Sequence, residues 1–166
     1  SEMLTLASDS LNKVSDDYII GVSHLKIVTE LLDKTELSEN KKIKITKCLA
    51  NKNAHEIKSI CENNGVDASI CEKIMALSQI YGDFEEMLPT LYEISESDSV
   101  KELEAVYEIL KKDNLHKNIK LDFSIMSDLD YYNGIIFQGY VSDVPTAVLS
   151  GGRYDNLIRK FNKKAD

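Results

Sequence analysis

Two short segments of the sequence hold residues whose types and spacing can build a small binding pocket. In LDYYNGIIFQGY, residues 129–140, the adjacent tyrosines Tyr131 and Tyr132 come first, and SGGRYDNL, residues 150–157, follows with the double glycine Gly151-Gly152. A tyrosine supplies apolar ring area and a hydroxyl that donates or accepts a hydrogen bond. Glycines let a ligand or a backbone approach closely. Hydroxyls around a small apolar cavity suit a neutral, hydrogen-bonding ring such as imidazole.

Strand geometry limits how the two tyrosines can share one cavity. Adjacent residues of a strand point to opposite faces of the sheet. Tyr131 and Tyr132 can therefore line the same pocket only if the strand bends, and Asn133-Gly134 can supply that bend.

The residues after the double glycine fit the same pocket. Arg153 and Asp155 are spaced to brace a turn, and Tyr154 can then face one of the strand tyrosines. The alternative is that the tyrosines are ordinary sheet residues and the glycines mark a sharp turn. The residues alone leave both interpretations open.

The composition narrows the class of protein. The chain has 166 residues, 43% of them hydrophobic, which suits one domain with a core of its own. No run approaches the roughly 18–20 apolar residues of a membrane span, and no hydrophobic region typical of a secretory signal is visible. The net charge of −8 argues against broad affinity for nucleic acid. We expect a cytoplasmic protein with no membrane partner.

The cysteines and histidines give no sign of a metal or a cofactor. Cys48, Cys61 and Cys71 form no Cys-x-x-Cys pair, and the three histidines are scattered without ligand spacing. We expect buried thiols in a reducing compartment, with no disulfide, metal or cofactor.

Hydrophobic periodicity predicts the elements of the first two thirds of the chain. Residues 2–14 read as an amphipathic helix, 17–23 as a buried strand, and 24–34 as a helix capped by Ser23. Residues 35–113 have helical spacing throughout, and we name this range the helical block. Three pairs in it resemble capping boxes, and Gly82 is expected to end a helix; the pairs are Asn53 with Glu56, Ser69 with Glu72, and Ser99 with Glu102.

After Asn114 the periodicity changes from helix to strand. Residues 119–126 alternate as a half-buried strand, 131–141 read as a second strand and 146–150 as a third, before a helix that starts near Arg153. This order predicts an α+β fold in which an antiparallel sheet with flanking helices carries an all-helical insertion.

The two opening segments together resemble the histidine-binding signature of the histidyl-tRNA synthetase family, within a class II aminoacyl-tRNA synthetase core. The likeness spans residues 119–161, and a looser likeness covers residues 1–33. It implies a partial class II core made of residues 1–34 and 114–166, with the helical block where family members carry an insertion. The chain shows none of the three class II motifs, so we expect it to be a piece of a longer protein.

The resemblance assigns roles to individual residues. It implies that histidine is bound by Tyr131, Tyr132, Gly151, Gly152 and Tyr154, and that the motifs are braced by Asp122, Arg153 and Asp155. Asp122 lies where the family has an Asp shortly before the first segment.

One departure from the family pattern bears on catalysis. Active synthetases have Arg-Gly-Leu before the tyrosine segment, whereas this chain has Ser127, Asp128 and Leu129. The family arginine is placed to stabilise the negative charge that builds up as a carboxylate attacks the α-phosphate of ATP. With Ser127 in its place, the sequence offers no catalytic residue.

In lacking this arginine, the chain resembles the catalytically silent branch of the family. That branch comprises the regulatory subunits of ATP phosphoribosyltransferase in histidine biosynthesis. The resemblance then implies a short-form catalytic subunit as partner, histidine as ligand, a homodimer for the full-length protein, and no tRNA. One alternative is an active histidyl-tRNA synthetase. Another is a protein-docking module, because residues 34–60 hold seven lysines against three acids and residues 61–110 hold twelve acids against two lysines.

Overall fold

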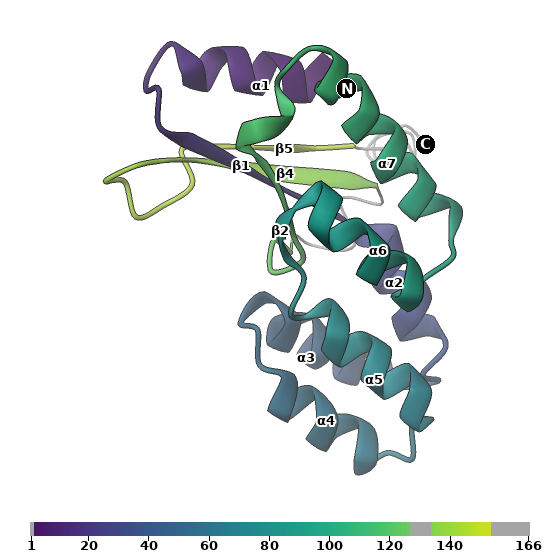
Figure 1. The fold of residues 1–166 in the computed structure, drawn as a ribbon. Coiled ribbons are helices and arrows are strands. Elements are labelled where there is room, and N and C mark those ends of the chain that lie inside the picture. The colour runs from purple at the N-terminus through teal and green to yellow at the C-terminus, as the bar shows by residue number, and fades with distance from the viewer. Residues whose placement is uncertain (1, 127–133, 154–166) are drawn as a thin grey trace, which may run out of the picture.

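The computed structural model describes residues 2–126 and 134–153. A five-stranded sheet carries helices on one face, and short helices extend beyond its lower end (Figure 1). The elements in chain order are α1 (Glu2–Asn12), β1 (Tyr18–His24), α2 (Leu25–Asp33), α3 (Glu39–Ala50), α4 (Ala54–Glu62), α5 (Ala68–Leu77), β2 (Tyr81–Asp83), α6 (Phe84–Ile94), α7 (Asp98–Lys112), a 3₁₀ turn (His116–Asn118), β3 (Ile119–Asp122), β4 (Ile135–Val141) and β5 (Leu149–Gly152).

The sheet has the strand order β2-β3-β1-β4-β5 and is mostly antiparallel, which confirms the predicted α+β class. One pairing differs from the expected antiparallel arrangement, because β1 and β3 run parallel, with Ile20 opposite Ile119. Parallel neighbours need a crossover connection. Here the whole stretch from α2 to α7 forms that crossover.

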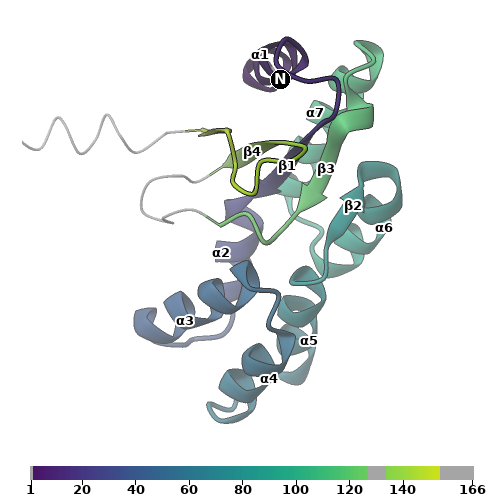
Figure 2. The same ribbon diagram turned by 90° about the vertical axis from the view of Figure 1, so that its left-hand side faces the viewer.

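Side-chain alternation sorts the strand residues onto two faces. Helices α1, α6 and α7 pack against one face (Figures 1 and 2). We name the other side the open face, and the register assigns to it Ile19, Gly21, Ser23, Lys120, Asp122, Ile136, Gln138, Tyr140, Ser150 and Gly152.

The strand after the helical block is shorter than the pattern predicted. It ends at Asp122 instead of 126, because the Asp122 carboxylate accepts hydrogen bonds from Ser124, at 2.9 Å from the backbone N–H and 2.6 Å from the hydroxyl. Such a local side-chain bond turns the chain out of the sheet. Ile125 then packs against the open face, where its Cδ1 atom would lie 2.4 Å from a Cβ placed on Gly21.

The expectation of helices throughout the helical block is correct except at β2, which pairs with β3 and contains Gly82. Gly82 therefore does not end a helix; α5 ends at Leu77. None of the helices in the described part of the chain is long and apolar enough to cross a membrane.

The predicted helix caps are right in one case of four. The Asn53 side chain accepts from the Glu56 N–H at 3.1 Å, as expected. Asp67 caps α5 in place of Ser69, and Ser97 precedes α7 in place of Ser99. Ser23 lies inside β1, because the strand continues through His24 before α2 begins.

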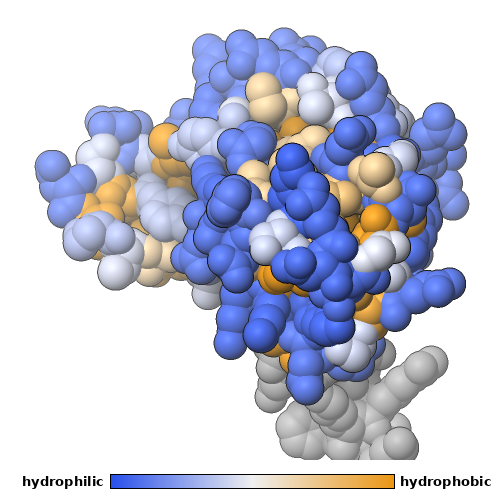
Figure 3. Space-filling view, turned by 90° about the horizontal axis from the view of Figure 1, so that it is seen from below, coloured by the Kyte–Doolittle hydropathy of each residue, from blue (hydrophilic) through white to orange (hydrophobic). Residues whose placement is uncertain are grey.

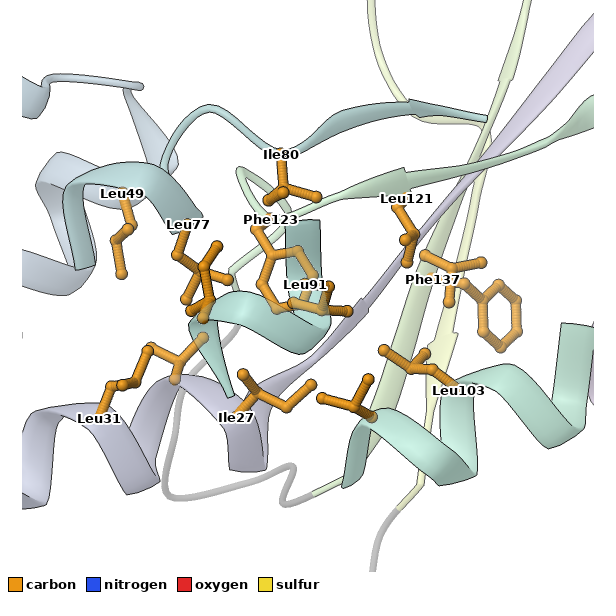
Figure 4. Close-up of a cluster of buried hydrophobic side chains, with 14 of the residues drawn as sticks. Ile27, Leu31, Leu49, Leu77, Ile80, Leu91, Leu103, Leu121, Phe123 and Phe137 are labelled. Carbon is orange, nitrogen blue, oxygen red and sulfur yellow. The ribbon is translucent and has the colours of Figure 1, made fainter. Parts of the chain in front are cut away.

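The sheet and the helical block share one hydrophobic core. Figure 4 shows Leu49 of α3 and Leu77 of α5 in the same cluster as Leu31 of α2 and Phe123, which follows β3. Leu49, Leu77 and Phe123 are fully buried. The helical block is therefore packed directly onto the elements that carry the predicted site.

Candidate functional site

The structure describes only part of the predicted site. Asp122, Gly151, Gly152 and Arg153 lie within the described residues. Five further positions lie outside them, namely Ser127, Tyr131, Tyr132, Tyr154 and Asp155.

The double glycine lies inside β5 and not at a turn. Gly151 is opposite Phe137 and Gly152 is opposite Ile136. A Cβ on Gly151 would lie 2.5 Å from the Phe137 Cζ atom, a distance that the buried ring could not accommodate without moving. Gly151 is therefore needed for strand packing, whatever it does for a ligand.

Asp122 and Gly152 face the same side of the sheet but do not meet. Ser23 of β1 is opposite Ile136 of β4, and Ile136 is opposite Gly152 of β5. On the other side of β1, Val22 pairs with Leu121 of β3, and Asp122 is the next residue along β3. Strands β1 and β4 thus separate Asp122 from Gly152. Within the described residues these two predicted positions form a row across the open face and not a closed pocket.

Two polar groups of the open face have unusual surroundings. The Ser23 hydroxyl is buried and has no hydrogen-bond partner in the described part of the chain. Burial raises the pKa of Tyr140, and the charge of Asp122 raises it further. Lys52 lies 3.8 Å from the Asp122 carboxylate. Asp122 thus holds the turn after β3 through Ser124 and contributes negative charge to this part of the open face.

Arg153 makes a contact that the sequence did not suggest. Its Nη1 atom lies 3.2 Å from Oε1 of Glu102 on α7, and Oε2 of the same carboxylate lies 3.2 Å from Nε2 of His24. The carboxylate can only accept, so His24 carries its proton on Nε2. We name Arg153, Glu102 and His24 the junction. Neither Glu102 nor His24 was predicted as a site residue, because no local spacing links positions so far apart.

A cavity of about 460 Å³ lies beside the junction, between α1, α7 and strands β4 and β5. Its lining is mostly apolar with Glu102 and Arg153 among its polar groups, and it consists of Glu2, Met3, Leu4, Glu102, Val106, Ile135, Phe137, Gly152 and Arg153.

Burial destabilises the charged form of His24 in the folded protein. The side chain is 1% exposed, and this loss of water lowers its pKa, although the hydrogen bond and charge of Glu102 oppose the shift. Glu30 of α2 also raises the pKa, and Lys26 lowers it. The neutral imidazole is therefore the form that the folded state favours.

This asymmetry predicts that the protein loses stability as the pH falls below 6.5, the ordinary pKa of histidine. In that window the unfolded chain binds a proton that folded His24 does not, so the contribution present above pH 6.5 is lost on acidification. Thermal unfolding between pH 7.5 and about pH 5.5 should show the decline. We expect His24→Gln to flatten it and His55→Gln, at an exposed histidine, to leave it unchanged. An equal slope in wild type and His24→Gln would contradict the assignment.

Comparison with known proteins identifies the family. Residues 1–166 match the family described as histidyl-tRNA synthetase. The ATP phosphoribosyltransferase regulatory subunit of Oceanobacillus iheyensis is 28% identical over 99% of this chain and 42% of that protein. The histidine–tRNA ligase of Methanococcus aeolicus is 31% identical over 97% of this chain and 40% of that protein.

The fold agrees with the sequence comparison. A crystal structure from Bacillus halodurans C, described as an ATP phosphoribosyltransferase regulatory subunit/histidyl-tRNA synthetase, superposes with a TM-score of 0.78 at 21% identity, over 89% of this chain and 40% of that one. The chain spans about two fifths of the length of each of these proteins.

Proposed function

Because the chain belongs to the histidyl-tRNA synthetase family, we propose that it is part of a non-catalytic regulatory subunit of ATP phosphoribosyltransferase in histidine biosynthesis. Its ligand is histidine, bound by Tyr131, Tyr132, Gly151, Gly152 and Tyr154. The full-length protein is a cytoplasmic homodimer that assembles with a short-form catalytic subunit.

The observation that carries this proposal is the pair Ser127-Asp128 within a signature that otherwise fits the family. A synthetase needs a cation there for the developing phosphate charge, and a carboxylate opposes it. A histidine sensor needs no such cation.

The test uses the full-length protein mixed with a short-form ATP phosphoribosyltransferase catalytic subunit. We expect a complex by size-exclusion chromatography, higher phosphoribosyltransferase activity than the catalytic subunit has alone, and histidine inhibition of that activity. Calorimetry should give a histidine Kd below about 1 mM, a binding free energy stronger than about −4 kcal/mol. Absence of both a complex and histidine binding would overturn the proposal.

A second function, histidyl-tRNA synthetase, is favoured by the 31% identity to the Methanococcus aeolicus ligase. It would require another cation to replace the missing arginine. The lysines between Lys41 and Lys58 would then have to contact the tRNA.

The helical block provides a third possibility, a docking module for another protein. The lower side of the molecule, where α3, α4 and α5 lie, is largely hydrophilic (Figure 3). If the block acts alone, an isolated piece of residues 35–113 should capture the catalytic subunit without histidine, an outcome that the sensor model does not predict.

A further inference from the structure

Three sulfur atoms lie together where α4 packs against α5 (Figure 1). Cys61, in the last turn of α4, is fully buried, and Cys71 of α5 is 6% exposed. A hydrogen bond links the Cys61 and Cys71 thiols, and the Cys71 Sγ atom lies 3.8 Å from Sδ of Met75. We name Cys61, Cys71 and Met75 the sulfur cluster. It lies in the helical block and shares no residue with the predicted histidine site.

The turn between α4 and α5 brings these residues together. Gly65 has a φ of 68°, in the left-handed region that glycine adopts without strain. The Val66 N–H then donates to the Cys61 carbonyl at 3.0 Å. Cys71 and Met75 are four residues apart on α5, so their side chains are neighbours on one face of that helix. The folded turn makes the cluster, which is why no Cys-x-x-Cys spacing revealed it.

The cluster offers only soft donor atoms. Thiolate and thioether sulfur select Cu(I), whereas a structural zinc site is closed by four ligands. Within residues 2–126 and 134–153, no group of three His, Cys, Asp or Glu side chains could hold a metal ion. The unbranched Met75 side chain can adapt to a third sulfur–metal contact. Two thiols with a thioether therefore suit a soft monovalent ion better than zinc.

The surroundings of Cys61 disfavour a role in thiol chemistry. Burial raises the pKa of Cys61 to about 12, with smaller contributions from the hydrogen bond and charge of Cys71 and from the charge of Glu62. A thiol that stays protonated is a poor nucleophile. A metal ion acts differently, because it displaces the thiol proton and neutralises the thiolate that it binds.

We propose that the sulfur cluster binds one Cu(I) ion, with Cys61 and Cys71 as thiolate ligands and Met75 as a weaker thioether ligand. Each thiol gives up its proton to solvent as its sulfur–copper bond forms, so one Cu(I) enters, two protons leave and no electron is transferred. The bound ion ties α4 to α5. This inference does not depend on the proposed function, because the two sites have no residue in common.

The experiment titrates the reduced full-length protein with Cu(I), without oxygen, against the coloured Cu(I) chelator bathocuproine disulfonate. We expect wild type to hold one equivalent of Cu(I) that excess Zn²⁺ does not displace. Cys61→Ala removes a ligand and should weaken the binding of this equivalent at least about 100-fold, the upper range for loss of a mere outer-shell partner. Met75→Leu conserves side-chain volume and removes only the thioether, so we expect about a tenfold loss.

Cys48→Ala is the matched control, because it makes the same change at a partly buried cysteine of α3 outside the cluster. It should bind Cu(I) like wild type. Circular dichroism checks that each variant is folded, and Met75→Leu serves as the test if Cys61→Ala does not fold. Wild-type affinity in Cys61→Ala or Met75→Leu, or an equal loss in Cys48→Ala, would refute the site. Displacement of Cu(I) by Zn²⁺ would refute its assignment to a soft monovalent ion.

Discussion

We expect the full-length protein to catalyse histidine-dependent ATP–pyrophosphate exchange at least about 100-fold more slowly than an active histidyl-tRNA synthetase in the same assay. Removing one preorganised group that stabilises transition-state charge commonly costs about 10²- to 10³-fold in rate. From the resemblance we infer that Ser127 takes the place of such a group, with the negative charge of Asp128 next to it in the sequence. Radiolabelled pyrophosphate exchange measures the reaction directly.

A double variant, Ser127→Arg with Asp128→Gly, restores the residues that the family has at these two places. Exchange above the wild-type level in this variant would mark Ser127 as the position where adenylation was lost. Robust exchange by the wild type would instead mean a working synthetase that supplies its phosphate-stabilising charge from elsewhere.

The second large effect concerns stability, and two isoleucines on the same helix test it. Ile45 of α3 is fully buried, whereas Ile43 is 49% exposed. We expect Ile45→Ala to lower the free energy of unfolding by about 2–5 kcal/mol, because it removes buried methyl groups and leaves a cavity. That is a large part of the roughly 5–15 kcal/mol that stabilises a typical domain. Urea denaturation gives the value.

Ile43→Ala makes the same chemical change where water already reaches the side chain, and we expect less than about 0.5 kcal/mol. Equal effects at the two positions would mean that α3 does not bury Ile45 as described. A large effect at Ile45 alone would confirm that this face of α3 is part of the buried core.

The sequence was sufficient for the elements that depend on local periodicity. The helix at 2–14, the strand at 17–23 and the α+β class were predicted correctly, because apolar spacing directly encodes which face is buried. The caps were less predictable. Asp67 and Ser69 are two residues apart, and both residue types fit the pattern of a helix N-cap. The choice of Asp67 over Ser69 depends on where the helix begins.

The features that the sequence could not supply are those made by tertiary contact. A three-residue strand such as Tyr81–Asp83 has no periodicity of its own, and the parallel pairing of β1 with β3 depends on the route of the crossover. Glu102 was predicted only as the capping-box partner of Ser99, whereas the fold places it between Arg153 and His24. The signature residues were recognisable only through resemblance, and the histidine roles of the tyrosines stay predictions.

The parallel pairing of β1 with β3 also determines how late in translation the sheet can begin to form. Ile20 pairs with Ile119, so β1 leaves the ribosome long before its neighbour exists. At roughly 5–20 residues per second, the intervening stretch of about 100 residues takes roughly 5–20 s to translate. During that time β1, which becomes a central strand, has no strand partner on either side, since β4 is made later still. The helices of α2–α7 form from local contacts and can collapse first. Until β3 and β4 have been made, the nascent chain therefore contains an unpaired apolar strand beside incompletely assembled helices. A ribosome-associated chaperone that binds β1 would be most useful in this interval.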